Sequence, residues 1–440
     1  MTNTSSALRT DHYELTMVDA ALRAGTANRA SVFEVFTRRL NGARRYAVLA
    51  GTGRMLEAIK QFRFTQQELE YLEKRNFLRP ETLDWLANYR FRGSISGYLE
   101  GEIFFPHSPL LTVESSFAEG VLLETIVLSI LNHDSAIATA ASRMVMASQN
   151  RSLTEMGSRR TSETSAVYAA RAAYIAGFAA TSNLEAGRSY AIPTMGTAAH
   201  SFTLLHDSEL DAFRAQVAAY GSNTTLLIDT YDIEQGVHNA IAAAGTELSA
   251  VRIDSGDIPV VASKVRKLLD SLGAHNTKIT VTNDLDEHTI AALAVAPVDS
   301  FGVGTSVVTG SGTPTLGMVY KLVARQDKSG QWQPVSKKSE GKISRGGKKV
   351  GMRQSAAEPT AEIVGILDAT TKFHEIKPPA GLDLISAPLV TNGEINPKNT
   401  GVQGIARARQ LHARRLSSLP PVAHSMRRGE PALNTEFIEL

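Results

Sequence analysis

The sequence predicts an α/β protein with a central parallel sheet, an α+β domain before it and antiparallel strands after it. Two observations lead to this fold class. Short apolar runs recur after residue 150, and most are followed by a small or acidic loop and a helical segment. The centres of the later runs lie roughly 22 to 28 residues apart, which is the length of a strand, a loop and a helix.

Seven runs fit this repeat between residues 152 and 306. They are "LTEMGSRR", "AATSN", "YAIPTMGT", "TLLIDTYD", "AVRIDSGD", "ITVTNDLD" and "SFGVGTS". A closed barrel and an open doubly wound sheet share this period, because periodicity alone does not close a sheet.

The flanking segments follow other patterns. The first ~110 residues mix helical segments with alternating runs such as "SISGYLEGEIFF". A strong helix is expected over "SSFAEGVLLETIVLSILNHD", where Ser116 and Glu119 have capping-box spacing. After Lys321, apolar alternation with Gly and polar turns predicts antiparallel strands that return to the N-terminal domain. We therefore expect three segments, at residues 1–135, 136–320 and 321–440.

Composition excludes several classes of function. The 440 residues contain no cysteine, so disulfides, thiolate zinc sites and cysteine nucleophiles are ruled out. The net charge of +2 does not suggest nucleic acid, and the basic runs at 337–353 and 405–415 lack interleaved aromatics and are typical of solvated faces. No run reaches the ~18 residues of a membrane span, and the N-terminus does not resemble a signal peptide. A cytoplasmic protein without membrane or nucleic-acid partners is expected.

Polar residues follow the predicted strands at the points where each strand ends. Because the carboxyl ends of parallel strands meet at one edge of a sheet, these residues are expected to form a site. They are Arg159, Arg160, Ser182, Asn183, Thr197, His200, Asp229, Asp232, Arg252, Asp254, Asp257, Asn283, Asp284, Gly302, Gly304 and Thr305.

The residue types suit a phosphorylated sugar. Glycines in "FGVGTS" allow a backbone to approach phosphate oxygens, and arginines bind anions through forked hydrogen bonds. Asp229 and Asp254 suit sugar hydroxyls or Mg²⁺. Each residue also has a plainer interpretation: the glycines as a turn, an arginine in a surface ion pair, an aspartate as a helix cap, or His200 as a core histidine.

Taken together, the motifs resemble those of nicotinate phosphoribosyltransferases, which are type II phosphoribosyltransferases. The matching stretches are "LRTDHYELTM", "GSRRT", "ATSNLEAG", "IPTMGTAAHSF", "LLIDTYD", "VRIDSGD" and "FGVGTSVVT", in family order over roughly residues 8–325. The resemblance implies an irregular seven-stranded, TIM-like α/β barrel with an N-terminal α+β open-faced sandwich. It also implies transfer of phosphoribosyl from phosphoribosyl pyrophosphate to nicotinate in NAD salvage, with ATP hydrolysed alongside and Mg²⁺ required.

The same resemblance assigns roles to individual residues. It makes His200 the phosphohistidine and a catalytic residue, and small residues at 196–199 leave space there for a phosphate. The other catalytic residues would be Asp229 and Asp254. Nicotinate would be bound by Tyr13, Arg159, Thr197 and Arg252, and phosphoribosyl pyrophosphate by Asp11, Arg252, Asp254, Gly304 and Thr305.

Further expectations concern partners and metals. The resemblance places Tyr13 and Asp11 in a neighbouring subunit's site, so a homodimer with shared active sites is expected. Mg²⁺ is expected on the substrate phosphates, with Asp229 as a candidate ligand, and no structural zinc is expected because cysteine is absent. Met156 departs from the aromatic residue that often covers the pyridine ring in related enzymes, so a ring sandwich is in doubt.

Three rival functions stay open from the sequence. A nicotinamide phosphoribosyltransferase shares the histidine and the ATP coupling, although the paired arginines of "GSRRT" favour a carboxylate substrate. A quinolinate enzyme lacks the ATP step. A catalytically silent relative would act as a regulatory or nucleic-acid-binding protein through the 337–353 run.

Overall fold

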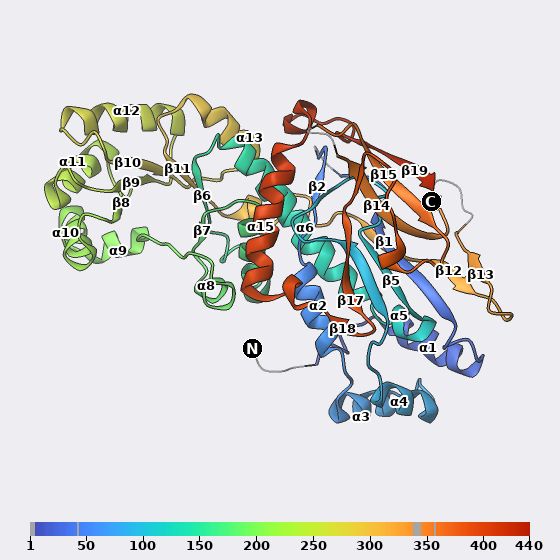
Figure 1. Cartoon of the computed structure of the whole chain (residues 1–440). Helices are drawn as coiled ribbons and strands as arrows, with labels where there is room; N and C mark the ends of the chain where they lie inside the picture. The colour runs from blue at the N-terminus through green and yellow to red at the C-terminus, as the bar shows by residue number, and fades with distance from the viewer. Residues whose placement is uncertain (1–4, 42–43, 338–344, 356–357) are drawn as a thin grey trace. The chain divides into compact units, whose positions relative to one another are not determined.

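The computed structural model of the chain describes residues 5–41, 44–337, 345–355 and 358–440. The chain divides into two compact units, drawn in Figure 1: residues 1–139 together with 313–440, and residues 140–312. The boundaries expected from the sequence lie at 135/136 and 320/321. Part of the basic run 337–353 lies outside the described residues.

The first unit is built on a seven-stranded sheet in the order β13-β12-β1-β5-β3-β17-β18. Each neighbouring pair is antiparallel. The strands are β1 (Ala30–Thr37), β3 (Ser94–Tyr98), β5 (Leu111–Ser116), β12 (Met318–Gln326), β13 (Trp332–Pro334), β17 (Ser386–Thr391) and β18 (Glu394–Ile395). Strands from the C-terminal part of the chain thus join the sheet formed by the N-terminal part.

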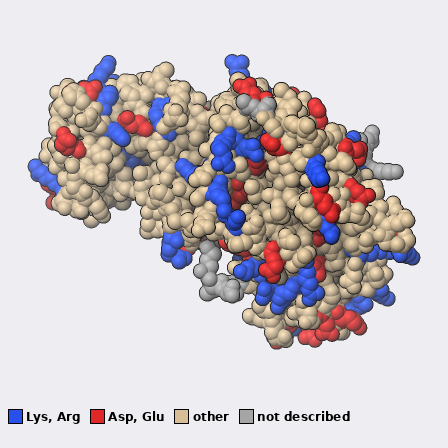
Figure 2. Space-filling view, in the orientation of Figure 1, with Lys and Arg blue, Asp and Glu red and all other residues tan. Residues whose placement is uncertain are grey.

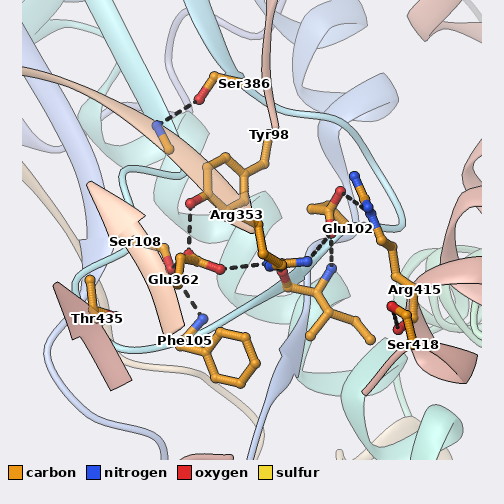
Figure 3. A network of polar contacts seen from close by, with 12 residues as sticks. Tyr98, Glu102, Phe105, Ser108, Arg353, Glu362, Ser386, Arg415, Ser418 and Thr435 are labelled. Carbon is orange, nitrogen blue, oxygen red and sulfur yellow. Dashed lines mark hydrogen bonds and ion pairs between the residues drawn. The ribbon is translucent and has the colours of Figure 1, made fainter. Parts of the chain in front are cut away.

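A second sheet in this unit has the order β16-β14-β15-β19. Its strands are β14 (Lys348–Gln354), β15 (Ala361–Leu367), β16 (Leu382–Leu384) and β19 (Asn434–Glu439), and a small pair joins β2 (Ala47–Val48) to β4 (Ile103–Phe104). Buried polar contacts link the two larger sheets (Figure 3). Arg353 of β14 pairs with Glu102 at 2.9 Å and Glu362 at 2.5 Å, and Glu362 accepts a bond from the Tyr98 hydroxyl. Pairing with two carboxylates offsets the cost of burying a guanidinium.

The helices of the first unit include α1 (His12–Arg23), α2 (Thr52–Gln61), α3 (Gln66–Arg75), α4 (Pro80–Ala87) and α15 (Gly401–Ser417). The single helix expected after Ser115 is divided into α5 (Phe117–Val121) and α6 (Glu124–Ala147). Ser116 caps α5 by accepting from the Glu119 N–H. Glu14 of α1 accepts from the N–H and hydroxyl of Thr125, which satisfies donors at the start of a separate helix α6.

The helical stretch Phe117–Ala147 is long and apolar enough to cross a membrane by length and composition. Because 67% of its most apolar window is buried inside the protein, it has the character of a core helix. The basic run 405–415 falls on α15, and its Arg407 and Arg414 are exposed. Figure 2 shows this run as a stripe of basic side chains on the surface of α15.

The second unit contains a six-stranded parallel sheet in the order β7-β6-β11-β10-β9-β8. Its strands are β6 (Ser152–Glu155), β7 (Ala180–Thr181), β8 (Thr225–Leu227), β9 (Ala250–Ile253), β10 (Lys278–Val281) and β11 (Ser300–Val303). Its helices are α7 (Glu163–Ile175), α8 (Leu184–Tyr190), α9 (His200–Leu205), α10 (Glu209–Tyr220), α11 (Ile233–Ala244), α12 (Ile258–Ser271), α13 (Glu287–Ala292) and α14 (Thr305–Val308). Helices α10, α11 and α12 lie along the outer side of β8, β9 and β10 (Figure 1).

One of the seven expected strands is missing from this sheet. The run "YAIPTMGT" forms only an isolated parallel bridge between Thr181 and Thr194. The Thr181 N–H donates to the Pro193 carbonyl, and the Met195 N–H donates to the Thr181 carbonyl. Pro193 has no N–H to add to a ladder, which explains why the pairing does not extend. The described residues therefore form a parallel half-barrel sheet.

Candidate active site at the carboxyl ends of the parallel strands

A cleft of about 570 Å³ lies where the strands of the parallel sheet end. It is lined by the loops after β6, β7, β9, β10 and β11 and by the segment that leads into α9. The lining includes these residues singled out from the sequence: Arg159, Arg160, Ser182, Thr197, His200, Arg252, Asp254, Asn283, Asp284, Gly302, Gly304 and Thr305. Parallel topology thus brings together residues that are up to about 150 positions apart in the chain.

His200 is the first residue of α9 and faces this cleft with its side chain 40% exposed. Its Nδ1 lies 3.0 Å from the Thr230 hydroxyl. Its Nε2 lies 3.8 Å from Asp254 Oδ2 and 4.0 Å from Asp229 Oδ1. The ring is therefore tethered at one nitrogen, while the other nitrogen faces two carboxylates beyond hydrogen-bond distance. This open environment is not that of a core histidine.

Asp229 is buried behind the histidine, with its side chain 1% exposed. Its Oδ2 accepts from the Asp254 N–H at 2.8 Å and from the Ser255 hydroxyl at 2.6 Å. Its Oδ1 has no hydrogen-bond partner among the described residues. Asp232, and not Asp229, caps α11, by accepting from the Gln235 N–H. Helix capping therefore does not explain Asp229, and a buried unpaired carboxylate oxygen indicates a site that expects a ligand or a positive charge.

Arg252 projects from β9 and is held by several partners. Its Nε donates to the Thr282 hydroxyl at 2.8 Å, and its Nη1 donates to the Thr197 hydroxyl at 3.1 Å. Its Nη2 lies 3.3 Å from Asp254 Oδ1, and that oxygen also accepts from the Thr282 hydroxyl. The guanidinium is thus oriented before any substrate arrives, which lowers the entropic cost of binding an anion.

The glycine loop after β11 is shaped by close packing. A Cβ on Gly302 would lie 2.6 Å from the Met156 sulfur and 2.7 Å from Thr282, so a larger residue would have to displace one of these side chains. A Cβ on Gly304 would meet the Met156 carbonyl group at ordinary contact distances, 3.5 Å to its oxygen and 3.9 Å to its carbon. Met156 itself lines the cleft and packs on this loop, at the position where the sequence raised doubt about a ring sandwich.

The two arginines after β6 are exposed and free to meet a ligand. Neither Arg159 nor Arg160 makes an ion pair with the residues that the structure describes. With Arg252 they bring positive charge to the cleft, while Asp254, which contacts Arg252, and Asp284 add carboxylates to its lining. Such an arrangement suits a ligand that carries several anionic groups and a polar, hydroxylated centre.

Tyr13 and Asp11 are not among the residues that line the cleft, and both belong to the first unit. Asp11 precedes α1, and the Tyr13 ring is 44% exposed. Burial of the hydroxyl and the neighbouring Glu124 raise the pKa of Tyr13 to about 12, so the phenol stays neutral. Asp11 and Tyr13 therefore belong to the first unit, whereas the residues that line the cleft all belong to the second.

Sequence reasoning missed three residues that organise the cleft. Thr230 and Thr282 hold His200 and Arg252, but a threonine at a strand end carries no specific signal. Glu155 at the end of β6 is fully buried, and burial raises its pKa. Its sequence signal is a charged residue that interrupts the apolar run before "MGSRR", from which Glu155 could have been singled out.

Comparison with known proteins agrees with this geometry. Residues 8–132 match the model of the nicotinate phosphoribosyltransferase N-terminal domain, and residues 151–363 match that of the nicotinate phosphoribosyltransferase family. Over 98% of its length the chain is 53% identical to nicotinate phosphoribosyltransferase pncB1 of Mycobacterium tuberculosis, of which it covers 95%. The chain belongs to the nicotinate phosphoribosyltransferase family. The resemblance drawn from the motifs is thereby confirmed.

Other family members are more distant. The nicotinate phosphoribosyltransferase of Bacillus subtilis is 37% identical over 73% of this chain and 68% of its own length. The crystal structure of the human nicotinic acid phosphoribosyltransferase superposes with a TM-score of 0.82 at 24% identity, covering 97% of each chain. This similarity shows that the two proteins share a fold over the superposed part of the chain.

The metal that the family reaction implies can be tested against the residues present. Among the described residues, no three His, Cys, Asp or Glu side chains gather to hold a metal ion by themselves. The unpaired Oδ1 of Asp229 and the Oδ2 of Asp254 both approach His200, and carboxylate oxygens are suitable ligands for Mg²⁺. Because Mg²⁺ commonly binds one or two carboxylates together with substrate phosphates, these residues fit the ion.

Proposed function

We propose that this protein transfers the phosphoribosyl group of phosphoribosyl pyrophosphate to nicotinate, giving nicotinate mononucleotide and pyrophosphate in NAD salvage. The observation that carries the proposal is one cleft that unites free arginines, an oriented Arg252, a glycine-threonine loop and a tethered histidine. Membership of the nicotinate phosphoribosyltransferase family supports it.

The chemistry requires binding and charge stabilisation more than proton transfer. The pyridine nitrogen of nicotinate attacks the anomeric carbon, and the bond from that carbon to pyrophosphate breaks. The ribose gains oxocarbenium character, which carboxylates such as Asp254 and Asp229 stabilise. Arg159 and Thr197 would bind nicotinate, and Arg252 would contact both substrates. Asp254, Gly304 and Thr305 would hold the phosphoribosyl group.

We assign the ATP-coupled part of the reaction to His200, which would accept a phosphoryl group and lose it to water in each cycle. Support comes from its half-exposed ring, the small neighbouring residues and the Thr230 hydroxyl that fixes the ring plane. A bound Mg²⁺ would neutralise charge on the pyrophosphate, with Asp229 and Asp254 as its protein ligands. ATP and Mg²⁺ are therefore the proposed co-substrate and cofactor.

The proposal extends to assembly, fold and location. Tyr13 and Asp11 would act in the site of a second copy, because the exposed and neutral Tyr13 ring is suited to stacking on a pyridine. The enzyme would be a cytoplasmic homodimer without nucleic-acid or membrane partners.

The Thr181–Thr194 bridge supports the description of the second unit as an irregular seven-stranded barrel, in which the segment around Thr194 takes the seventh position.

Product formation with and without Mg-ATP tests the proposal. Purified protein is given phosphoribosyl pyrophosphate with nicotinate or with nicotinamide, and ADP released is counted per nucleotide made. ATP-stimulated nicotinate mononucleotide is the expected result. Preference for nicotinamide would replace the substrate assignment, and synthesis indifferent to ATP would remove the phosphohistidine role of His200.

A further inference from the structure

The arginine loop is joined to the loop after β7 by a closed ring of hydrogen bonds. Glu155 Oε1 accepts from the Gly157 N–H at 2.5 Å, and Oε2 accepts from the Thr181 hydroxyl at 2.5 Å. The Thr181 oxygen accepts in turn from the Asn183 N–H at 3.0 Å. The Asn183 side-chain amide then donates to the Ser158 hydroxyl at 3.0 Å, and Ser158 follows Gly157 directly.

The direction of each bond in this ring is fixed by its neighbours. Asn183 Oδ1 accepts from the Ala186 N–H at the start of α8, so the amide NH₂ must face Ser158. The Thr181 oxygen accepts from an N–H, so its own hydrogen is available for Glu155. Glu155 thus accepts at both oxygens, from the Gly157 N–H and from the Thr181 hydroxyl.

The ring occupies a buried place under the cleft wall. Glu155 and Thr181 are both 0% exposed, so a lost partner there leaves an unsatisfied buried group. A Cβ on Gly157 would lie 2.2 Å from Val308 and 2.9 Å from the Gly304 carbonyl oxygen, so the loop is pressed against the glycine-threonine loop. A small shift of residues 157–158 would therefore move both loops that face the ligand.

The positions of Arg159 and Arg160, which follow directly in the chain, depend on this ring of hydrogen bonds. The side chains of Arg159 and Arg160 are exposed and make no ion pair among the described residues. The Arg160 N–H donates to the Gly157 carbonyl, which closes a turn directly after the ring. The backbone conformation of the loop thus sets the Cα positions from which the flexible side chains of Arg159 and Arg160 extend.

We propose that Glu155, Thr181 and Asn183 are positioning residues that set substrate affinity by holding the arginine loop, without touching substrate themselves. The inference rests on the proposed function, in which this loop binds nicotinate. Misplacement of a binding loop weakens substrate binding more than it slows the chemical step. The ring should therefore control KM and the dissociation constant, and leave kcat largely intact.

The test replaces Thr181 in two ways. Thr181→Val removes two of the four ring bonds with little change in shape, whereas Thr181→Ser keeps the hydroxyl. Thr277→Val is the matched control, because Thr277 is also buried in this unit and loses one hydroxyl bond, to the Leu248 carbonyl, at the opposite ends of the strands. Both KM values, kcat, and the dissociation constants of nicotinate and phosphoribosyl pyrophosphate are measured for each variant.

We expect Thr181→Val to raise the KM and dissociation constant for nicotinate about tenfold, from loss of roughly two hydrogen bonds. Its kcat should fall less than threefold, and Thr181→Ser and Thr277→Val should stay within twofold of wild type. Unchanged affinity in Thr181→Val, no rescue by serine, or an equal loss in Thr277→Val would each overturn the proposal. If Thr181→Val does not fold, Ser158→Ala takes its place, because it removes the bond that the Asn183 amide donates to Ser158. The same changes in KM, dissociation constant and kcat are then expected of Ser158→Ala.

This design separates the two proposals. Wild-type protein that makes no nicotinate mononucleotide would defeat the proposed function. The dissociation constants, which need no turnover, would still show whether the ring controls ligand binding at the cleft.

Discussion

Asp229→Asn separates the electrostatic role of Asp229 from its structural role. One oxygen of Asp229 accepts two hydrogen bonds, and the other faces His200 without a partner. Asparagine has one carbonyl oxygen, which can keep both accepted bonds if its NH₂ takes the unpaired position toward His200. The substitution therefore removes a negative charge beside the histidine while leaving the local structure in place.

The size of the effect follows from the distance. A charge 4.0 Å from the imidazole Nε2 contributes about 4 kcal/mol at an effective dielectric constant of ~20. Because the His200 ring is 40% exposed, solvent screening reduces this to about 2 kcal/mol. His200 gains positive character as it accepts a phosphoryl group, so the phosphorylation rate should fall about 30-fold.

The assay is ADP release from Mg-ATP in the presence of nicotinate and phosphoribosyl pyrophosphate, with thermal unfolding measured on the same samples. Asp229→Asn should change the free energy of unfolding by less than about 1 kcal/mol, since both accepted bonds are kept. Asp232→Asn is the control, because asparagine also caps helices and Asp232 caps α11. Full nicotinate-dependent ATP hydrolysis in Asp229→Asn would refute the reasoning.

Three further outcomes are expected. His200→Ala should abolish nicotinate-dependent ADP release while the thermal unfolding profile stays cooperative, and undiminished coupled hydrolysis would exclude His200 as the phosphoryl acceptor. Gly157→Ala should destabilise the protein by about 1 to 3 kcal/mol through overpacking against Val308; an unchanged melting temperature would contradict the close packing. Burial raises the pKa of Glu14 to about 7, so the folded state binds more protons than the unfolded state between about pH 4.5 and 7. Each pH unit in that window should remove about 1.4 kcal/mol of stability, and Glu14→Gln should lose most of this dependence in denaturant titrations at several pH values.

Much of the second unit could be predicted from local pattern. The spacing of the apolar runs marks β8, β9, β10 and β11, because a strand and its crossover helix have a nearly fixed length. Parallel pairing then forces the polar residues that end these strands to one edge. Arg252 and Gly304 lie at the cleft in agreement with that logic, whereas His200 follows a run that adds no strand to the sheet. The missing strand around Thr194 shows its limit, since an apolar run does not reveal whether it has a partner to pair with.

In the first unit, local pattern gave element types but not all boundaries. Capping-box spacing located the start of α5 at Ser116. The interruption before α6 depends on Glu14, which lies 111 positions from Thr125 in the chain. The nearby residues give no sign of such a cap.

The sequence by itself determined the α/β class, the parallel repeat, the family and the residues at the strand ends. These properties depend on periodicity, on composition and on motifs that lie within a few residues of one another. Only the tertiary structure decided which oxygen of Asp229 is left unpaired, that Thr230 and Thr282 orient His200 and Arg252, and that Glu155 closes a ring with Thr181 and Asn183. Each of these contacts joins different loops of the second unit at specific atoms, so it depends on sheet register and loop conformation, which local sequence does not specify.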